Sequence, residues 1–365
     1  MAKVVRTAIH TEDEDINFIR GLADTVNGIL SKKGSENVIM VGEDGGDDGV
    51  PYWVRSGIPQ LDFAVGGKCH PGFPGARIIE IYGGEGAGKS TLAVWLTHCS
   101  MIQQNAFAYY QDAERVLTPE IIKGTGINMN RVMRDQPDTL EEVFDSQEAV
   151  LEQISSKFPD RPVTITTDSI AACSTKSEIE GDMDDAQMAP HARLMSKGLR
   201  KIKSPINDSN VLSIWVNQTR EKIGQAFGDT TSTFGGRAMA FYASVRIKLT
   251  KIKTLKKDGK GAVPYGCTIQ AKIVKDKVAP PLKEVNYDIL FIEGEDGSYP
   301  RIDVEGAVLD WCKENELIGG GQGRYEVGGK NLYKDQARQY LIENPDVFEE
   351  LQELAYSIAI PPKED

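Results

Sequence analysis

The residues with the clearest chemical potential lie in one short segment, GGEGAGKST, from Gly83 to Thr91. The segment satisfies G-x-x-x-x-G-K-[ST], and it lies between an expected strand at 77–82 and an expected helix at about 89–104. Glycines let backbone N–H groups surround a phosphate, and the helix dipole adds positive charge. Lys89 is expected to contact the β- and γ-phosphates of a nucleotide, and Ser90 to offer its hydroxyl to Mg²⁺. The other expected nucleotide contacts are Gly83, Glu85, Gly86, Ala87, Gly88 and Thr91.

Three polar side chains follow expected strands. Asp168 ends PVTITTD, and a carboxylate there can hold Mg²⁺ through water, although an isolated aspartate after a strand is usually a turn or helix cap. Glu114, in YYQDAERVL, is a candidate base for activating water or, equally, a carboxylate at a helix start. Gln218, at the end of SIWVNQ, has a neutral amide suited to contacting a γ-phosphate or to bonding local backbone. The phosphate loop upstream favours the metal interpretation for Asp168.

The composition is that of a globular protein. The chain has 365 residues, with 40% hydrophobic and 26% charged side chains, and its longest apolar runs have the length of strands. No secretory signal is visible in MAKVVRTAIHTEDED, so we expect a cytoplasmic protein without a membrane segment. Five cysteines without zinc spacing indicate reduced thiols. The net charge of −12 argues against nucleic acid as a partner, but 193–203 and 246–260 are locally basic, and binding depends on the local field.

The order of elements predicts an α/β protein. We expect a central, mostly parallel twisted sheet with covering helices, a helix–strand arm before it and a small α/β domain after it. The expected parts are residues 1–50, 51–294 and 295–365. Expected helices are 12–33, 307–318 and 334–358, and expected strands are 35–41, 76–82, 105–112, 162–168 and 211–218, with antiparallel strands at 241–253, 265–277 and 284–294.

The segment NQTREKIGQAFGDTTSTFGG, residues 217–236, fits no ordinary element. It has short polar patches, two isolated large apolar residues and a Gly-Gly end. A long connection without regular structure inside a compact domain is usually functional. We therefore expect a binding loop here.

Taken together, these segments resemble the bacterial RecA recombinase family. The resemblance covers nearly the whole chain in sequence order, whereas a phosphate loop alone is unspecific. It rests on EIYGGEGAGKST, QDAERVLTPE, QPDTLEE, DSIAACSTKSEIEGDMDDAQM, HARLMSKGLRKI, NQTREKIGQAFGDTTSTFGGRAMAFYASVR and KIVKDKVAPPLKE. The short tail PPKED, where the family usually has a longer acidic tail, is consistent with a phage-encoded member.

The resemblance implies a P-loop RecA-type ATPase core and an ATP-dependent DNA recombinase that uses Mg²⁺. Such a protein forms helical filaments on single-stranded DNA and pairs that strand with homologous duplex DNA, in recombination, repair and the SOS response. Glu114 would activate water, and Gln218 would contact the γ-phosphate and pass its presence to the adjoining loop. Lys275 and Lys277, which we expect on one face of one strand, would reach the ATP of the neighbouring subunit.

The resemblance also implies two DNA-binding loops, 180–190 and 217–236. Met188 and Ile223 would insert between stretched bases, while cations and backbone N–H groups would hold phosphates. Ile121 and Thr118 stand where many members have tyrosine and aspartate. The DNA-binding residues implied are Met188, Arg193, Ser196, Arg200, Arg220, Glu221, Lys222, Ile223, Phe227, Gly235, Gly236 and Arg237.

Three other functions remain to be weighed. A ring-forming helicase motor accounts for the phosphate loop and Gln218, but not for the arm or the paired lysines. A non-catalytic DNA scaffold or co-protease platform would not exchange strands. A metabolic P-loop kinase would need an acceptor pocket instead of DNA loops.

Overall fold

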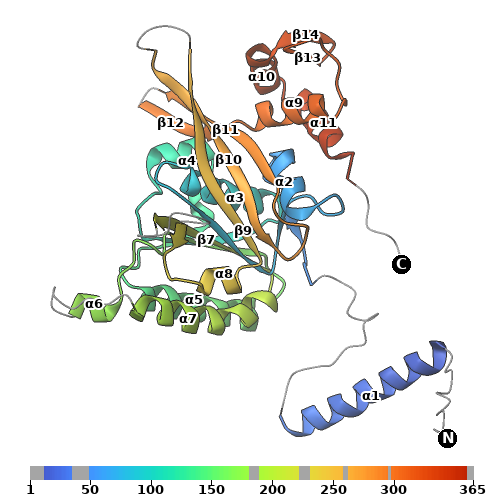
Figure 1. Ribbon diagram of the computed structural model, residues 1–365, viewed down its shortest axis with the longest axis vertical. Coiled ribbons are helices and arrows are strands. Elements are labelled where there is room, and N and C mark those ends of the chain that lie inside the picture. The colour runs from blue at the N-terminus through green and yellow to red at the C-terminus, as the bar shows by residue number, and fades with distance from the viewer. Residues whose placement is uncertain are drawn as a thin grey trace, which may run out of the picture. The chain divides into compact units, whose positions relative to one another are not determined.

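The computed structural model describes residues 12–34, 49–180, 189–221, 231–257, 262–294 and 297–359 (Figure 1). The chain divides into two compact units, Met1–Gly49 and Val50–Asp365. In the first unit, α1 (Glu12–Lys32) confirms the expected helix. Its large apolar side chains Phe18, Ile19, Leu22 and Ile29 are exposed. The strand expected at 35–41 lies outside the described residues.

The second unit is built on a 10-stranded sheet with the order β12-β11-β10-β9-β3-β7-β6-β4-β5, to which β8 is attached by pairing with β7. The strands from β9 to β5 pair in parallel, and those from β9 to β12 pair antiparallel, which confirms the expected mostly parallel sheet with an antiparallel extension. The strands are β3 (Arg77–Gly83), β4 (Phe107–Asp112), β5 (Val132–Asp135), β6 (Val163–Asp168), β7 (Val211–Glu221), β8 (Thr231–Thr233), β9 (Val245–Lys256), β10 (Pro264–Asp276), β11 (Glu284–Gly294) and β12 (Gly297–Ile302).

Helices cover both faces of this sheet because its central strands are apolar on both sides. Ile214 packs into the cluster that contains Leu92 and Leu96 of α3, whereas the next residue, Trp215, packs into the cluster that contains Phe144 and Leu199 of α5 and α7. The α3 side positions the phosphate loop, and the α7 side carries a basic run. The helices of this core are α2 (Pro59–Gly66), α3 (Lys89–Gln103), α4 (Pro119–Thr125), η1 (Met129–Arg131), α5 (Leu140–Lys157), α6 (Lys176–Glu180), α7 (Ala189–Asn207) and α8 (Ala238–Tyr242).

The C-terminal elements share their core with the α3 side of the sheet. Leu309 and Leu351 belong to the same buried cluster as Leu96, and β12, which lies beyond the boundary expected at 294, is the edge strand of the central sheet. The long helix expected at 334–358 is wrong, because Pro345 begins a new helix where proline cannot continue the preceding one. The elements are α9 (Val304–Glu314), β13 (Arg324–Val327), β14 (Lys330–Tyr333), α10 (Lys334–Glu343) and α11 (Pro345–Tyr356), while β1 (Trp53–Val54) pairs with β2 (Phe73–Pro74).

A buried carboxylate joins the last helix to the core. Asp62 of α2 accepts hydrogen bonds from the backbone N and the hydroxyl of Ser56, at 2.9 and 2.7 Å, and from the hydroxyl of Tyr356 in α11. Burial raises the pKa of Asp62 to about 6, although these hydrogen bonds oppose the shift. The docking of α11 therefore depends on a titratable group.

The ends of the segment 217–236 correct the expectation of no regular structure. β7 continues to Glu221, and β8 pairs with it antiparallel, with Thr219 opposite Thr233 and Glu221 opposite Thr231. The segment is therefore a hairpin at its described ends. Residues 222–230 lie outside the described part of the chain.

Candidate functional site

The phosphate loop connects β3 to α3 and exposes its backbone. Gly86 and Gly88 have φ angles of 66° and 76°, in the left-handed region that favours glycine. A side chain on Gly83 would overlap with the carbonyl oxygen of Leu249 on β9, and a Cβ on Gly88 would lie 2.5 Å from Ile289. Glycine is therefore required both for the left-handed backbone conformation of the loop and for its close packing against β9 and β11 of the sheet.

Two side chains at the start of α3 face the loop and the neighbouring strand. The Nζ of Lys89 donates to the carbonyl oxygen of Gly84, at 2.8 Å. Burial lowers the pKa of Lys89, while the carboxylates of Glu114 and Asp168 act in the opposite direction. The hydroxyl of Ser90 donates to Oδ1 of Asp168, at 3.2 Å. The structure thus brings Lys89, Ser90 and Asp168 together as expected.

Asp168 is buried at the end of β6 and bonded from two sides. Its Oδ2 accepts from the hydroxyl of Tyr110 on β4, at 2.9 Å, in addition to the bond from Ser90. Burial raises the pKa of Asp168 to about 7, and the nearby carboxylates of Glu114 and Asp112 add to the shift, while its two hydrogen bonds lower it. A hydroxyl next to a carboxylate fits Mg²⁺, which prefers oxygen ligands and keeps several waters. Within the described ranges no group of histidine, cysteine and acidic residues could hold a metal ion by itself.

Glu114 and Gln218 are directly bonded to each other. The amide of Gln218 donates to Oε1 of Glu114 at 2.7 Å, and the hydroxyl of Ser169 donates to the same oxygen at 2.5 Å. Glu114 is exposed in the turn after β4, and α4 begins only at Pro119, so the interpretation as a helix-start carboxylate is wrong. In the pairing of β3 with β7, Gln218 lies opposite Gly83, which places its amide beside the phosphate loop.

The end of β7 is also bonded to the turn that follows β8. The side-chain amide of Asn217 donates to the carbonyl oxygen of Phe234 at 3.1 Å and to Oε1 of Glu80 at 2.8 Å. The backbone N of Phe234 donates to the carbonyl oxygen of Gln218, at 3.4 Å. Sequence reasoning missed Asn217, Glu80 and Ser169, although Asn217 adjoins Gln218.

Several residues expected to contact DNA share the surface around α7 and α8. Arg193, Arg200 and Arg237 are exposed, and Ser196 is half-buried on α7. Gly235 and Gly236 have φ angles of 77° and 71°, and a Cβ on Gly235 would lie 2.7 Å from Met195 of α7. Met188, Lys222, Ile223 and Phe227 lie outside the described residues, and Arg220 and Glu221 belong to β7 without described side chains.

The two lysines expected on one strand differ in position. Lys275 is on β10, and its Nζ donates to the carbonyl oxygens of Ala240, Phe241 and Ala243, at 2.8, 3.0 and 2.6 Å, at the C-terminal end of α8. Burial lowers its pKa to about 8, and the charge of Lys277 contributes. Lys277 is exposed just beyond the end of β10, and the pairing shifts between Ile273 and Lys275. The expectation of a shared strand is therefore wrong for Lys277.

The geometry can be compared with known proteins. The model of the RecA N-terminal domain family matches residues 20–296. The chain is similar to Protein RecA of Halalkalibacterium halodurans, with 37% identity over 82% of this chain and 80% of that protein. It is 38% identical to Protein RecA of Nostoc punctiforme, over 82% and 79% of the two chains. It is 38% identical to Protein RecA of Streptomyces coelicolor, over 82% and 75%.

Proposed function

The chain belongs to the RecA family, and on this premise we propose that its phosphate loop binds ATP with Mg²⁺ and that its basic surfaces bind single-stranded and homologous duplex DNA. It is an ATP-dependent recombinase of DNA recombination and repair, and a DNA-dependent ATPase. Among the described residues no helix combines the length and apolar character needed to cross a bilayer. The observation that carries the proposal is the bond between Gln218 and Glu114, which adjoins both the phosphate loop and the turn after β8.

The nucleotide would be held by the residues that already face the loop. Lys89, which donates to Gly84 in this structure, would turn its ammonium to the β- and γ-phosphates. Ser90 and Asp168, 3.2 Å apart, would hold Mg²⁺, which supplies charge neutralisation on the phosphate oxygens when it is bound. The remaining contacts proposed come from the backbone of Gly83, Glu85, Gly86, Ala87, Gly88 and Thr91.

Glu114 would act as the base that takes a proton from the attacking water. Its carboxylate is exposed, so water reaches it, and Ser169 and Gln218 orient one of its oxygens. When the amide of Gln218 turns to a γ-phosphate instead, Oε1 of Glu114 loses one of its two donors and can accept a hydrogen bond from the attacking water. Hydrolysis then becomes conditional on the nucleotide.

The same amide would couple the nucleotide to DNA. A movement of Gln218 would displace Phe234, because the backbone N of Phe234 donates to the carbonyl oxygen of Gln218. The neighbouring residue, Asn217, also donates to the carbonyl oxygen of Phe234. The chain continues directly into Gly235, Gly236 and Arg237, and the exposed arginines of α7 lie on the same surface. A movement of Gln218 would therefore change the contacts that this surface makes with DNA phosphates. Met188 and Ile223 are proposed to insert between bases, and Arg220, Glu221, Lys222 and Phe227 to complete the loop.

A second basic surface is proposed for the homologous duplex. Figure 1 shows the ends of β9 and β10 projecting beyond the rest of the sheet, and Lys251, Lys253 and Lys256 are exposed there. Lysines on a protruding ribbon attract phosphates without reading bases. Watson–Crick pairing would then supply the test of homology.

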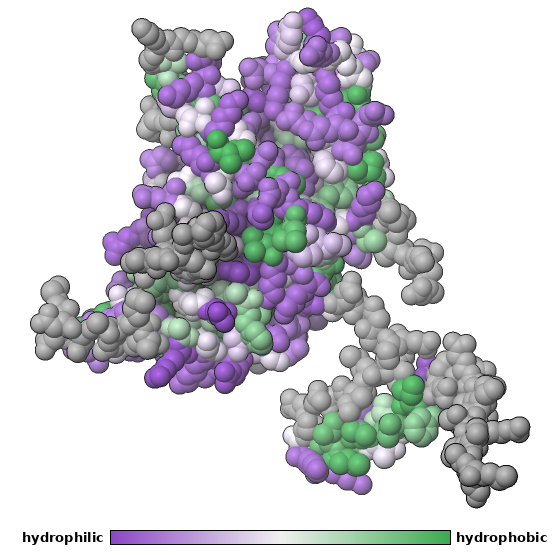
Figure 2. Space-filling model, viewed as in Figure 1, coloured by the Kyte–Doolittle hydropathy of each residue, from purple (hydrophilic) through white to green (hydrophobic). Residues whose placement is uncertain are grey.

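Filament assembly would use an apolar groove at the sheet edge. The groove has a volume of about 420 Å³ beside the edge strand β5 and is lined by the exposed side chains of Phe107, Met133 and Phe158. Figure 2 shows apolar side chains gathered on α1, and the acidic start of α1 suits Arg131 and Arg161 of the groove. We propose that α1 of a second copy packs here. Such a head-to-tail contact does not close on itself, so the assembly is open-ended.

In this proposal, residues 1–50 are the polymerisation arm, 51–294 the ATPase core and 295–365 the C-terminal domain. In the filament, Lys277 would complete the ATP site of the neighbouring copy, since its side chain is exposed. Lys275 would reach that neighbouring ATP site only after its Nζ releases the carbonyl oxygens at the end of α8.

The test is ATP hydrolysis with and without single-stranded DNA, at several salt concentrations, with strand exchange between homologous DNAs as a second readout. We expect stimulation by DNA that weakens as salt rises, strand exchange that requires ATP, and long filaments in electron micrographs. A hydrolysis rate indifferent to DNA would refute the proposed coupling, and closed rings would favour a helicase motor.

A further inference from the structure

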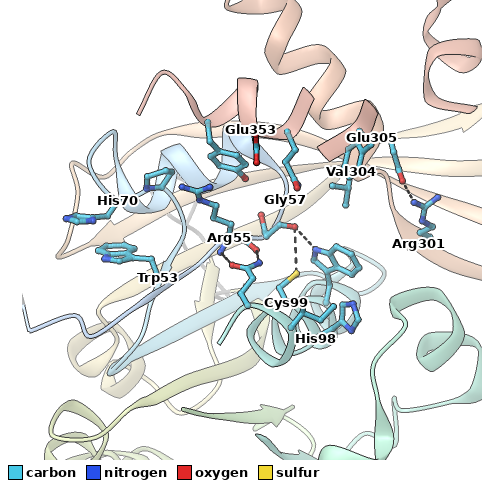
Figure 3. Close-up of a pocket in the computed structure, with 18 of the residues that line it drawn as sticks. Trp53, Arg55, Gly57, His70, His98, Cys99, Arg301, Val304, Glu305 and Glu353 are labelled. Carbon is cyan, nitrogen blue, oxygen red and sulfur yellow. Dashed lines mark hydrogen bonds and ion pairs between the residues drawn. The ribbon is translucent and has the colours of Figure 1, made fainter. Parts of the chain in front are cut away.

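A cavity of about 660 Å³ lies between the core and the C-terminal helices (Figure 3). Its walls come from the segments around β1 and β2, from the outer side of α3, from the start of α9 and from α11. The volume is in the range of about 300–1,000 Å³ that small-molecule sites occupy. The cavity is therefore large enough for a ligand of several rings.

This cavity is separate from the phosphate loop. Both are built on α3, but the loop uses Lys89 and Ser90 at its start, whereas the cavity is lined by Trp95, His98 and Ile102. At about 1.5 Å per residue, Trp95 lies about 9 Å and Ile102 about 20 Å from Lys89 along the helix, and the residues that line the cavity include none of 83–91. One molecule in the cavity would therefore not occupy the nucleotide site.

Aromatic rings line the cavity on two sides. Trp53 stacks on His70 with ring centroids 5.3 Å apart and an interplanar angle of 6°. On α3, Trp95 and His98 lie 5.3 Å apart at an angle of 33°. Burial lowers the pKa of His98, which favours the neutral form of its ring. These rings offer flat apolar surfaces on which a planar heterocycle can stack.

One wall carries a carboxylate oxygen without a donor. Glu305, at the start of α9, is 6% exposed, and its Oε1 accepts an ion-paired hydrogen bond from Arg301. Its Oε2 is buried and has no hydrogen-bond partner among the described residues. Leaving a buried charged acceptor unpaired is costly. The lining of the cavity thus includes a carboxylate with one buried oxygen that lacks a donor.

The lining also contains a cation, Arg55. Arg55 is exposed, and its guanidinium lies 4.2 Å from the ring centroid of Tyr356. Its backbone N donates to Oε1 of Gln103 at 2.9 Å, and its carbonyl oxygen accepts from Nε2 of Gln103 at 2.6 Å. Figure 3 shows Arg55 between the Trp53–His70 pair and the wall formed by Arg301 and Glu305. The guanidinium is positioned for an anionic group that enters the cavity mouth.

We propose that this cavity binds a guanine nucleoside monophosphate, with its base stacked among the aromatic side chains, the ring N1–H donated to Glu305 and its phosphate on Arg55. The three features act on different parts of one molecule, since planar rings match the base, an acceptor matches its N–H edge and a guanidinium matches the phosphate. The ligand would bridge α3 and α11. The site is additional to the ATP site and holds whether or not that site works as proposed.

Calorimetric titration with GMP and with guanosine tests the proposal, on the full chain carrying Lys89→Ala so that the phosphate loop does not compete. We expect saturable binding of both, with GMP the tighter because only it carries a phosphate. Arg55→Gln should remove that advantage and leave guanosine binding unchanged. Glu305→Gln should weaken both about tenfold, as loss of a hydrogen bond to a charged group does.

Matched controls remove an equivalent group outside the lining. Lys68→Ala deletes a cation from the exposed segment before Cys69, and Glu350→Gln changes an exposed carboxylate of α11, and neither should change affinity. The proposal is overturned if neither compound binds at millimolar concentration, or if binding persists unchanged in both lining variants. Binding of inorganic phosphate as tight as that of GMP would also overturn it, because the base would then contribute nothing.

Discussion

Replacing Gln218 by alanine isolates the coupling between nucleotide and DNA. The substitution removes the donor that bonds Oε1 of Glu114 at 2.7 Å, while Ser169 continues to hold the same oxygen. A hydrogen bond to a charged group is worth about 1.5–3 kcal/mol, or a factor of about 10–150. The backbone contact from Phe234 to Gln218 does not depend on the side chain, so β7 should keep its place. We therefore expect the fold and the nucleotide affinity to survive.

The assay is the ratio of ATP hydrolysis with single-stranded DNA to hydrolysis without it. In Gln218→Ala we expect this ratio to fall about tenfold or more, while the Kd for ATP changes less than about threefold. Gln339→Ala is a matched control, because its amide donates to Glu343 at the same 2.7 Å on the surface of α10. A ratio that stays at the wild-type value, or that falls only in step with ATP affinity, would contradict the role assigned to Gln218.

Four further outcomes are expected. Lys89→Ala should weaken ATP binding at least tenfold in a filter-binding assay, since it deletes the one side-chain cation of the loop, and unchanged affinity would remove the phosphate-loop assignment. Lys277→Ala should bind ATP normally and lose DNA-stimulated hydrolysis; normal stimulation would exclude a role across the interface. Phe18→Asp places a charge on the exposed apolar stripe of α1 and should leave monomers in sedimentation runs where wild type forms long assemblies. Tyr356→Phe should cost about 1.5–3 kcal/mol in urea unfolding at pH 8 and less at pH 5, because the folded pKa of Asp62, about 6, lies above its unfolded value of 3.8. Protonation of Asp62 stabilises the fold fully below the unfolded pKa, and this stabilisation is lost as the pH rises through about 6. Above that pH the ionised carboxylate depends most on the hydrogen bond from Tyr356. An equal loss of unfolding free energy in Tyr356→Phe at pH 5 and pH 8 would refute this dependence.

The sequence alone determined the parts of the fold that depend on local chemistry. The glycines and the lysine of GGEGAGKST define a phosphate loop because their requirement for positive φ and for a bare backbone is a property of the residues themselves. The apolar strands of the sheet and the helix α1 were also predictable, since burial imposes a period of two or of 3.6 on the sequence. Pro345 carried a local signal for a helix break that the long apolar pattern outweighed.

Tertiary structure alone decided which side chains meet. Strand β5, four residues long, and β12, six residues long, show no distinctive pattern because edge strands are partly exposed. The bond between Gln218 and Glu114 joins residues 104 positions apart, and it forms only because the order of parallel strands brings two strand ends to one edge. The family resemblance assigned Lys275 to a neighbour's ATP site, whereas in this structure the carbonyl oxygens at the end of α8 bind it within its own chain. The cavity beside α11 is equally a product of assembly, because its acceptor, its cation and its rings come from four separate segments whose proximity is set by packing and by nothing local.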